Sequence, residues 1–425
     1  MTAPSLQVGS LAESKHCLAV SPQRLTMFLS ELGQIGRAES GGFFREALTD
    51  ADHAARLRYL GWAKDAGFSS AYDSAGNLFV QLVGRKPALA PVMTGSHLDT
   101  QPDGGGYDGI LGVVSGLEAL CAIQATGIQP RRSIEVAVWM NEEGSRFTPG
   151  CMGSRAFVEP ELLGHFRKIA DDGGTTLGTE LDRLNKLMPP HVERRPLGGK
   201  VHRFVELHIE QGPLLEQASR VFGIVEGVQG YRRYTVDVIG ESAHSGTTPR
   251  RNRKDALLAA IDIIRCLADK FEDKADALRF TVGKMALEPN SPFVVPGRVK
   301  FWVDIRHPER ETLEQSDVAL RMICNSVDGW EIRVQPLSAM DPIHFSPEIV
   351  DSIEAHAAKQ KESSMRIFSG AGHDAQMLHL ICPSGMIFVP CKRGISHSPK
   401  EDIQLEHAHA GAQLLAELLT DWAET

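Results

Sequence analysis

The 425-residue sequence lacks a hydrophobic run that approaches the roughly 18 apolar residues of a membrane-spanning helix. It also lacks a basic N-terminal region followed by an apolar stretch, so we expect no secretory signal peptide. Basic residues are in the minority, since 45 Lys and Arg stand against 54 Asp and Glu, for a net charge of −9. An acidic protein is a poor partner for nucleic acid or an anionic membrane, so we expect neither as a partner.

Cysteine is scarce and scattered. The seven cysteines lie at positions 17, 121, 151, 266, 324, 382 and 391, without CxxC spacing. An odd, dispersed set favours reduced thiols in a cytoplasmic protein over a disulfide framework.

The chain shows the alternation of helices and strands that is typical of an α/β domain. Residues 21–67 have apolar side chains at helical spacing. Strand-like runs are predicted at 77–83, 91–94, 133–140, 201–209 and 385–390, and helices at 109–125 and 347–361. The helix between the second and third runs is a crossover connection, which implies parallel strands.

The region from about 222 to 338 has a different order of helices and strands. Its expected order is strand 234–239, helix 253–271, strands 278–287 and 298–306, helix 309–327 and strand 330–337. This βαββαβ order is the split βαβ arrangement of a ferredoxin-like domain. We therefore predict an α/β domain with a mixed sheet in two chain segments, 1–221 and 339–425, and an inserted ferredoxin-like domain at 222–338.

The segment TGSHLDTQPDGGGYD (residues 94–108) is the most informative part of the chain. It places His97, Asp99 and Asp108 among turn-forming glycines directly after an apolar run. An α/β sheet usually has its functional side chains just past the carboxyl ends of its strands. Imidazole and carboxylate groups that converge there are ligands for zinc or a similar divalent metal. Taken alone, the segment could also be a polar turn that closes a strand.

Three further strand ends have similar side chains. Glu142 and Glu143 follow one strand, and neighbours in an extended segment point apart, so one carboxylate can bind metal while the other handles a proton. His208 ends a second strand before a Gly-Pro turn, and His397 follows a third. Singly, the glutamates are explained equally well as a solvated acidic turn and His397 as a surface-loop histidine, whereas His208 is explained better as a hydrogen-bonded core histidine. Together with the first motif they supply enough ligands for two metals that share one carboxylate, as in hydrolytic two-metal sites.

In combination, these motifs resemble the hydantoinase/carbamoylase family, a relative of the dinuclear zinc aminopeptidases and dipeptidases. Its members include N-carbamoyl-L-amino acid amidohydrolases, allantoate amidohydrolases and β-ureidopropionases. The resemblance runs from about residue 21 to the C-terminus. The matching segments are GSHLD (95–99), GYDG (106–109), NEEGSRF (141–147), HIEQGP (208–213), HSGTTP (244–249), SGAGHD (369–374) and ISHSP (395–399).

The resemblance implies two divalent metal ions per subunit, with zinc preferred and manganese, cobalt or nickel as alternatives. His97, Asp108 and His208 would hold one ion. Asp108, Glu143 and His397 would hold the other, so that Asp108 bridges the two.

It also implies how the reaction is catalysed. Glu142 would be the general base that takes a proton from metal-bound water, whose pKa the metal lowers towards neutrality. Asp99 would orient His97. In the peptidase branch the position of His208 is usually acidic, so the histidine favours the carbamoylase branch.

In the family, the inserted domain is a lid and dimerisation domain. The histidine equivalent to His244 reaches the active site of the partner subunit and stabilises the tetrahedral intermediate, so we expect a homodimer. From the residues alone, His244 could equally be a loop histidine that caps a turn. Gln211 and the loop from Gly370 to His373, which includes Gly372, are expected substrate contacts.

Arg306 matches the arginine that binds the substrate carboxylate in the family, a task suited to its planar guanidinium. Its alternative is a surface arginine paired with Asp304 or Glu309. The sequence departs from the family thirteen residues upstream, where Phe293 replaces an asparagine that normally assists the arginine. This difference puts the usual carboxylate pocket in doubt.

The implied activity is hydrolysis of a linear C–N bond other than a peptide bond, in an N-carbamoyl amino acid or a related ureido acid, by metal-bound hydroxide. An N-acyl-amino-acid hydrolase or a dipeptidase of the same superfamily is the alternative activity. A non-catalytic binding protein on the same scaffold would normally have lost a ligand or the base. All five expected ligands and Glu142 are present here.

Overall fold

The computed structural model describes residues 18–274 and 277–425. The described chain forms two compact units. The first contains the residues up to Ile224 with Ser346–Arg366 and His373–Thr425, and the second contains Val225–Phe345 and Ile367–Gly372. The expectation of no signal peptide and the position of Cys17 concern residues 1–17, outside the described part. No helix of the described residues is long and apolar enough to cross a membrane.

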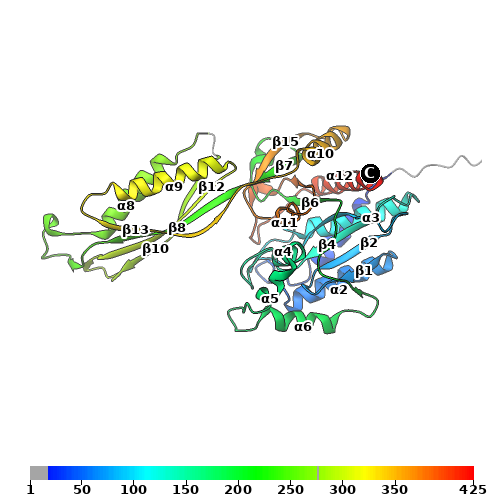
Figure 1. Ribbon diagram of the computed structural model, residues 1–425, viewed down its shortest axis with the longest axis horizontal. Coiled ribbons are helices and arrows are strands. Elements are labelled where there is room, and N and C mark those ends of the chain that lie inside the picture. Colours follow the sequence, from blue (N-terminus) through cyan, green and yellow to red (C-terminus); the bar gives the residue numbers. More distant parts are fainter. Residues whose placement is uncertain (1–17, 275–276) are drawn as a thin grey trace, which may run out of the picture. The chain divides into compact units, whose positions relative to one another are not determined.

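The first unit contains most of the helices (Figure 1). They are α1 (Pro22–Leu32), α2 (Asp50–Asp65), α3 (Ile110–Ala125), α4 (Met152–Val158), α5 (Leu163–Phe166), α6 (Leu177–Leu187), α7 (Leu214–Gln217), α10 (Pro347–Lys359), α11 (Asp374–Leu378) and α12 (Leu405–Glu424). Short 3-10 turns lie at Pro160–Leu162 and Lys392–Gly394. α3 is apolar almost throughout and packs against α12 and the strands, so it is buried on all sides rather than amphipathic.

The strands of the first unit are β1 (Ser69–Tyr72), β2 (Leu78–Leu82), β3 (Val92–His97), β4 (Ile134–Trp139), β5 (Glu193–Arg194), β6 (Arg203–Ile209) and β16 (Ser384–Val389). Their order in the sheet is β16-β6-β3-β4-β2-β1-β5. The first four are parallel to one another, whereas β2 is antiparallel to both β4 and β1. β3, β4 and β16 are buried along their whole length, as parallel strands covered on both faces usually are.

The second unit contains β8 (Gly230–Ile239), β9 (Ala243–His244), β10 (Arg279–Glu288), β11 (Val294–Val295), β12 (Arg298–His307), β13 (Glu331–Met340) and β14 (Ile343–His344). Its helices are α8 (Ala256–Lys270) and α9 (Arg310–Asn325), with a 3-10 turn at Arg250–Asn252. β7 (Phe222–Val228) and β15 (Ser364–Ser369) run from one unit into the other along the chain.

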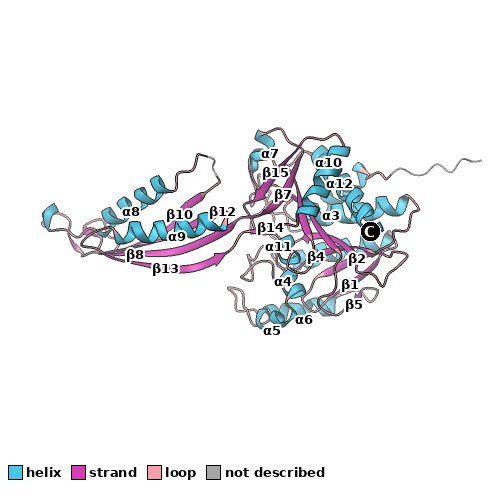
Figure 2. Ribbon diagram, turned by 45° about the horizontal axis from the view of Figure 1, so that its top comes forward, coloured by secondary structure: helices cyan, strands magenta, loops and turns pink. Residues whose placement is uncertain are grey.

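Four strands of the second unit form an antiparallel sheet in the order β10-β12-β8-β13. Figure 2 shows α8 and α9 on one side of this sheet. Alternate strand residues point to these helices and form a core with them, which includes Val236, Val238, Phe301 and Ile263. The expected strand–helix–strand–strand–helix–strand order is present in β8, α8, β10, β12, α9 and β13.

The predicted mixed α/β fold is confirmed, with differences in detail. β3 extends to His97 instead of ending at Thr94, so His97 is the last residue of a strand and not part of a turn. Residues 141–143 form a bend, which begins with Asn141 at φ 55, so the expected extended segment at Glu142 and Glu143 is wrong. β1 and α12 were not predicted.

Candidate functional site

The carboxyl ends of four parallel strands bring the expected metal ligands to one edge of the first unit's sheet. His97 ends β3 and His208 lies near the end of β6. Glu143 follows β4, and His397 follows β16. Because these strands are parallel neighbours, their carboxyl ends lie at the same edge, as the sequence pattern predicted.

His97, Asp108 and His208 form a first donor group that is almost fully buried. Asp108 Oδ1 lies 3.5 Å from His97 Nε2 and 3.1 Å from His208 Nε2. Gly109 allows the close approach: its φ is +70, and a Cβ there would lie 2.4 Å from the His97 ring. Two imidazoles and a carboxylate within 4.8 Å of one another are suitable ligands for a divalent metal.

Asp108, Glu143 and His397 form a second donor group beside the first. Asp108 Oδ2 lies 3.3 Å from His397 Nε2, which lies 3.4 Å from Glu143 Oε2. Each oxygen of Asp108 thus faces a different group. The His397 side chain is 47% exposed, so this side of the site is open to solvent. The donor atoms fit two divalent ions that share the Asp108 carboxylate.

The electrostatics of the two groups are coupled through Asp108. Burial opposes ionisation of Asp108, but hydrogen bonds from His208, His397 and His97 outweigh it and hold its pKa well below the ordinary value. The Asp108 contact raises the pKa of His397 to about 9, while burial and Asp108 raise the pKa of Glu143 to about 7. A divalent ion that binds these atoms must therefore displace protons.

Glu142 lies next to His97 of the first group, with 9% of its side chain exposed. Its Oε2 is 3.5 Å from His97 Nε2, and the Cys151 thiol donates to its Oε1 at 3.5 Å. Burial raises the pKa of Glu142 well above the ordinary value. Although the two glutamates lie in a bend, they still face different neighbours, Glu142 towards His97 and Glu143 towards His397.

Asp99 joins these residues in a different way from the one expected. The ring nitrogen Nδ1 of His97 bonds to the main-chain carbonyl of Asp99 at 2.9 Å, whereas the Asp99 carboxylate is 4.0 Å away. The carboxylate instead accepts the backbone N–H groups of Glu142 at 3.3 Å and of Glu143 at 3.2 Å. Asp99 therefore contacts both the His97 ligand and the two glutamates.

Two residues that the sequence interpretation missed hold the ligands in place. Gln101 donates from its backbone N to Glu143 Oε1 at 3.1 Å and from Nε2 to Oε2 at 2.9 Å. Glu401 accepts the backbone N–H of Asp108 at 3.0 Å. Gln101 lies two residues after Asp99, and Glu401 lies four residues after His397. Their nearness to these motifs in the sequence could have identified both as candidate site residues.

Gln211, an expected substrate contact, lies at the second group. Its Nε2 donates to Asp108 Oδ2 at 2.7 Å and is 3.3 Å from His397 Nε2.

The other expected substrate contacts belong to the second unit. His244 lies in the short strand β9 rather than in a loop, and its Nδ1 accepts the backbone N–H groups of Gly246 and Thr247. β9 pairs with β11, which places Phe293 next to it: the Phe293 carbonyl accepts the backbone N–H of Ser245 at 3.2 Å. Phe293 is 73% exposed.

Arg306 makes the alternative contact considered above. Its Nε and Nη2 donate to Asp304 Oδ2 at 3.1 and 2.9 Å, and its Nη1 donates to the carbonyl of Gly370 at 2.8 Å. Gly370 begins the predicted contact loop, whose residues up to Gly372 also belong to the second unit.

Phe293 and Arg306 lie at opposite ends of the second unit's sheet. Arg306 pairs with Tyr231 and Arg298 with Ile239, so eight residues of β12 separate the two ends, or roughly 27 Å of extended strand. β11, with Phe293 before it, is separated from Arg298 by Pro296 and Gly297 alone. Within one chain Phe293 therefore does not adjoin Arg306, as a shared carboxylate pocket would require.

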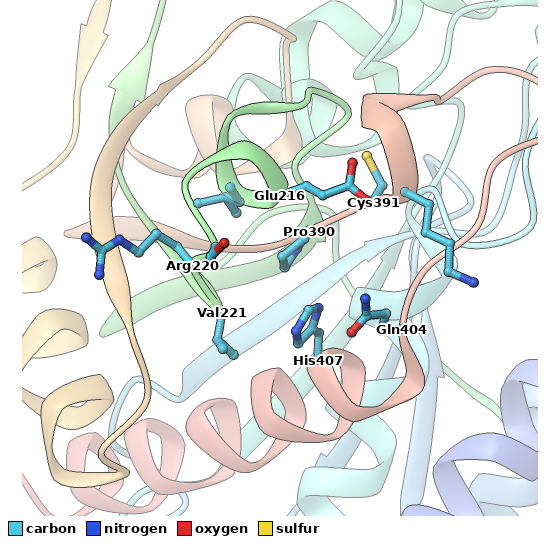
Figure 3. Close-up of a pocket in the computed structure, with 10 residues that line it drawn as sticks. Glu216, Arg220, Val221, Pro390, Cys391, Gln404 and His407 are labelled. Atoms are coloured by element: carbon cyan, nitrogen blue, oxygen red, sulfur yellow. The ribbon is translucent and has the colours of Figure 1, made fainter.

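A separate cavity of about 240 Å³ lies between the α7 segment, the end of β16 and the start of α12 (Figure 3). Glu216, Pro390 and His407 are among its lining residues, and none of the expected site residues is. The cavity is not part of the candidate metal centre.

Comparison with known proteins identifies the family of the chain. Peptidase family M20/M25/M40 matches residues 93–421, and the chain belongs to this family. An N-carbamoyl-L-amino-acid amidohydrolase from Rhizobium meliloti is 37% identical over 409 residues, which cover 95% of this chain and 97% of the relative. An allantoate amidohydrolase from Bacillus subtilis is 34% identical, over 93% of this chain and 96% of the relative.

The solved structures point to the same branch. A crystal structure of an amidase of the hydantoinase/carbamoylase family from Burkholderia multivorans is 40% identical, with a TM-score of 0.90, and the match covers 96% of this chain and 99% of that chain. The resemblance inferred from the motifs is confirmed. So is the expected enzyme class, a hydrolase of C–N bonds.

Proposed function

We propose that this protein hydrolyses the C–N bond of an N-carbamoyl amino acid or a related ureido acid. The observation that supports this most directly is the pair of donor groups that share Asp108, with the buried Glu142 beside them. The names of the relatives add the substrate class.

His97, Asp108 and His208 would hold one divalent ion, and Asp108, Glu143 and His397 the other. Zinc is the preferred metal, with manganese, cobalt or nickel as alternatives. When bound, such ions polarise a carbonyl group and lower the pKa of a water molecule towards neutrality.

Glu142 would act as the general base, because its carboxylate reaches the first donor group and is shielded from bulk water. It accepts a proton from the attacking water molecule and passes it to the leaving nitrogen. Asp99 keeps Glu142 and Glu143 in position through their backbone N–H groups. Cleavage releases the amino acid and a carbamate, which decays to ammonia and CO2.

The inserted domain, residues 222–338, would be a ferredoxin-like lid and dimerisation domain. His244 is exposed and lies far along β12 from Arg306, so one substrate molecule contacted by both requires them to come from different chains. We therefore propose a homodimer in which His244 acts in the partner's site and Arg306 binds the substrate carboxylate. Phe293, beside His244, would then favour a bulkier or atypical ureido substrate over N-carbamoyl-glycine or N-carbamoyl-alanine. The dispersed cysteines support a cytoplasmic location.

An ammonia-release screen tests the proposal. The metal-loaded protein is incubated with N-carbamoyl amino acids of graded side-chain size, allantoate and ureidopropionate, and dipeptides and N-acetyl amino acids are assayed by amine release. Turnover of a ureido acid well above that of every dipeptide and N-acetyl amino acid is expected. Preferential cleavage of a dipeptide or an N-acyl amino acid would refute the ureido assignment.

A further inference from the structure

Arg45 is a fully buried cation in the N-terminal segment, ahead of the residues matched by the family. Burial lowers its pKa to about 10, so the side chain remains charged at neutral pH. No carboxylate of the described residues lies within ion-pair distance of it, and its Nη2 has no hydrogen-bond partner among them. A buried charge without an ion-pair partner is costly, so its retention calls for an explanation.

The contacts of Arg45 converge on the peptide groups on either side of Asp99. Its Nε donates to the carbonyl of Leu98 at 2.8 Å. Its backbone N donates to Thr100 Oγ1 at 3.2 Å, and the backbone N of Thr100 donates back to the Arg45 carbonyl at 3.1 Å. Three hydrogen bonds thus hold the segment Leu98–Thr100.

The other end of the guanidinium is anchored in the first helix region. Nη1 donates to the carbonyls of Leu32 at 3.1 Å and of Ile35 at 2.7 Å. Leu32 is the last residue of α1, and the C-terminal end of a helix favours a cation. Arg45 therefore connects a packed helix end to the loop that follows β3.

Asp99, between the two clamped residues, contacts three residues of the proposed centre. Its carbonyl meets His97 Nδ1, and its carboxylate accepts the backbone N–H groups of Glu142 and Glu143. A small shift of this peptide would move a metal ligand from each donor group together with the base.

We propose that Arg45 is a positioning residue for the metal centre, which acts by holding the Leu98–Thr100 segment so that Asp99 orients His97, Glu142 and Glu143. The inference rests on the proposed function only in assuming that metal ions bind at the two donor groups. It gives the N-terminal segment a role in metal affinity in addition to its role in the core.

Arg56 provides a matched control. It is also fully buried in the N-terminal segment, but it donates to Asp52 Oδ2 and to the carbonyl of Gly76, both at 2.8 Å, and not to the metal loop. Arg45→Met and Arg56→Met both remove a buried guanidinium. Only the first removes a contact to the residues around Asp99.

The experiment measures the affinity of each variant for zinc by competition with a chelating indicator, and the coordination of cobalt(II) by its visible absorption. Arg45→Met is expected to lower the affinity about 10-fold and to alter the cobalt spectrum, as loss of a residue behind a metal ligand commonly does. Arg56→Met should change the affinity much less than Arg45→Met does, although it lowers the unfolding stability, because Arg56 makes no hydrogen bond to the Leu98–Thr100 segment. Equal losses in the two variants, or no loss in Arg45→Met, would overturn the proposal.

If either methionine variant fails to fold, the pair Arg45→Lys and Arg56→Lys is used in place of the methionine pair, because lysine keeps the positive charge but lacks the several N–H donors of the guanidinium group. Thr100→Val removes one acceptor of the clamp and should give a smaller loss of affinity in the same direction. The proposal is also overturned if both Arg45→Lys and Thr100→Val bind metal as the parent does. Metal binding is measured without substrate, so a protein that binds metal but hydrolyses no ureido acid would refute the proposed function and leave this inference standing.

Discussion

The first donor group of the first unit and two expected substrate contacts of the second unit, His244 and Phe293, are held in opposite ways. His97, Asp108 and His208 are at most 3% exposed, and each makes a hydrogen bond to another residue of the first unit. Phe293 is 73% exposed, and the His244 ring accepts the backbone N–H groups of Gly246 and Thr247, two and three residues further along the chain.

The difference shows what one chain can organise by itself. A buried, hydrogen-bonded set of donors is already in place before a ligand arrives, so its binding energy is not used to order side chains. The exposed side chains of His244 and Phe293 are not packed in this way, and we expect the substrate or a second copy of the chain to order them.

The largest effect on the buried metal ligands is expected from Asp108→Ala, because each oxygen of this carboxylate belongs to one donor group. We expect loss of both metal ions and of all measurable turnover. Metal content after dialysis, measured by atomic emission, and ammonia release check this. Asp103→Ala, on the same loop but outside both donor groups, should keep both metals. A variant of Asp108 that retained two ions would contradict the bridging role.

Glu142→Gln should separate chemistry from metal binding. The amide keeps the shape of the side chain but cannot accept the proton, so kcat should fall roughly 10²- to 10⁴-fold. Metal content should equal that of the parent protein. Appreciable residual activity, or loss of the metals, would contradict the role of Glu142.

His244→Ala tests whether the exposed His244 acts in the active site of the partner subunit. Loss of a group that stabilises the tetrahedral intermediate should lower kcat about 10²- to 10³-fold. Mixing this variant with Glu142→Gln should restore activity, since one site of the hybrid would have an intact base and an intact histidine. A mixture that exchanges subunits and stays inactive would count against the arrangement.

Gln101→Leu would remove a hydrogen bond that holds the ligand Glu143, without removing a ligand itself. Glu143 would lose the side-chain hydrogen bond to its carboxylate, and we expect about a 10-fold loss of affinity for the second metal ion. Stepwise metal titration measures this, with Gln129→Leu on the surface as the control. Unchanged affinity would mean that Gln101 contributes only to packing.

Phe293→Asn should have the smallest effect and act on specificity. A donor would replace an apolar ring beside His244, so KM for N-carbamoyl-L-alanine should fall several-fold, since a hydrogen bond to a charged group is worth about 1.5–3 kcal/mol. Phe44→Asn, another exposed phenylalanine, should change nothing. If the parent already hydrolyses small N-carbamoyl amino acids efficiently and the variant gains nothing, the specificity argument is wrong.

Much of the fold could be predicted because local patterns encode strands and helices. The apolar runs at β2, β4 and β6 and the helical spacing in α8 and α9 were found close to their observed bounds. β1, with the mixed sequence SSAY, was missed because its residues have no clear alternation of apolar and polar side chains. The bend at Asn141 was missed because a non-glycine residue at positive φ is uncommon and depends on its surroundings.

The sequence by itself determined which donors lie at the strand ends, because residue type and strand periodicity are local properties and parallel strands end at a common edge. Only the tertiary structure decided how those donors divide between the two oxygens of Asp108, because this depends on distances between residues up to 289 positions apart. The tertiary structure also decided that the Asp99 carboxylate accepts the backbone N–H groups of Glu142 and Glu143, and that Arg45 donates to the carbonyl of Leu98. The register of β12 separates Phe293 from Arg306. These facts follow from packing and strand register, which link distant segments and leave no local trace in the sequence.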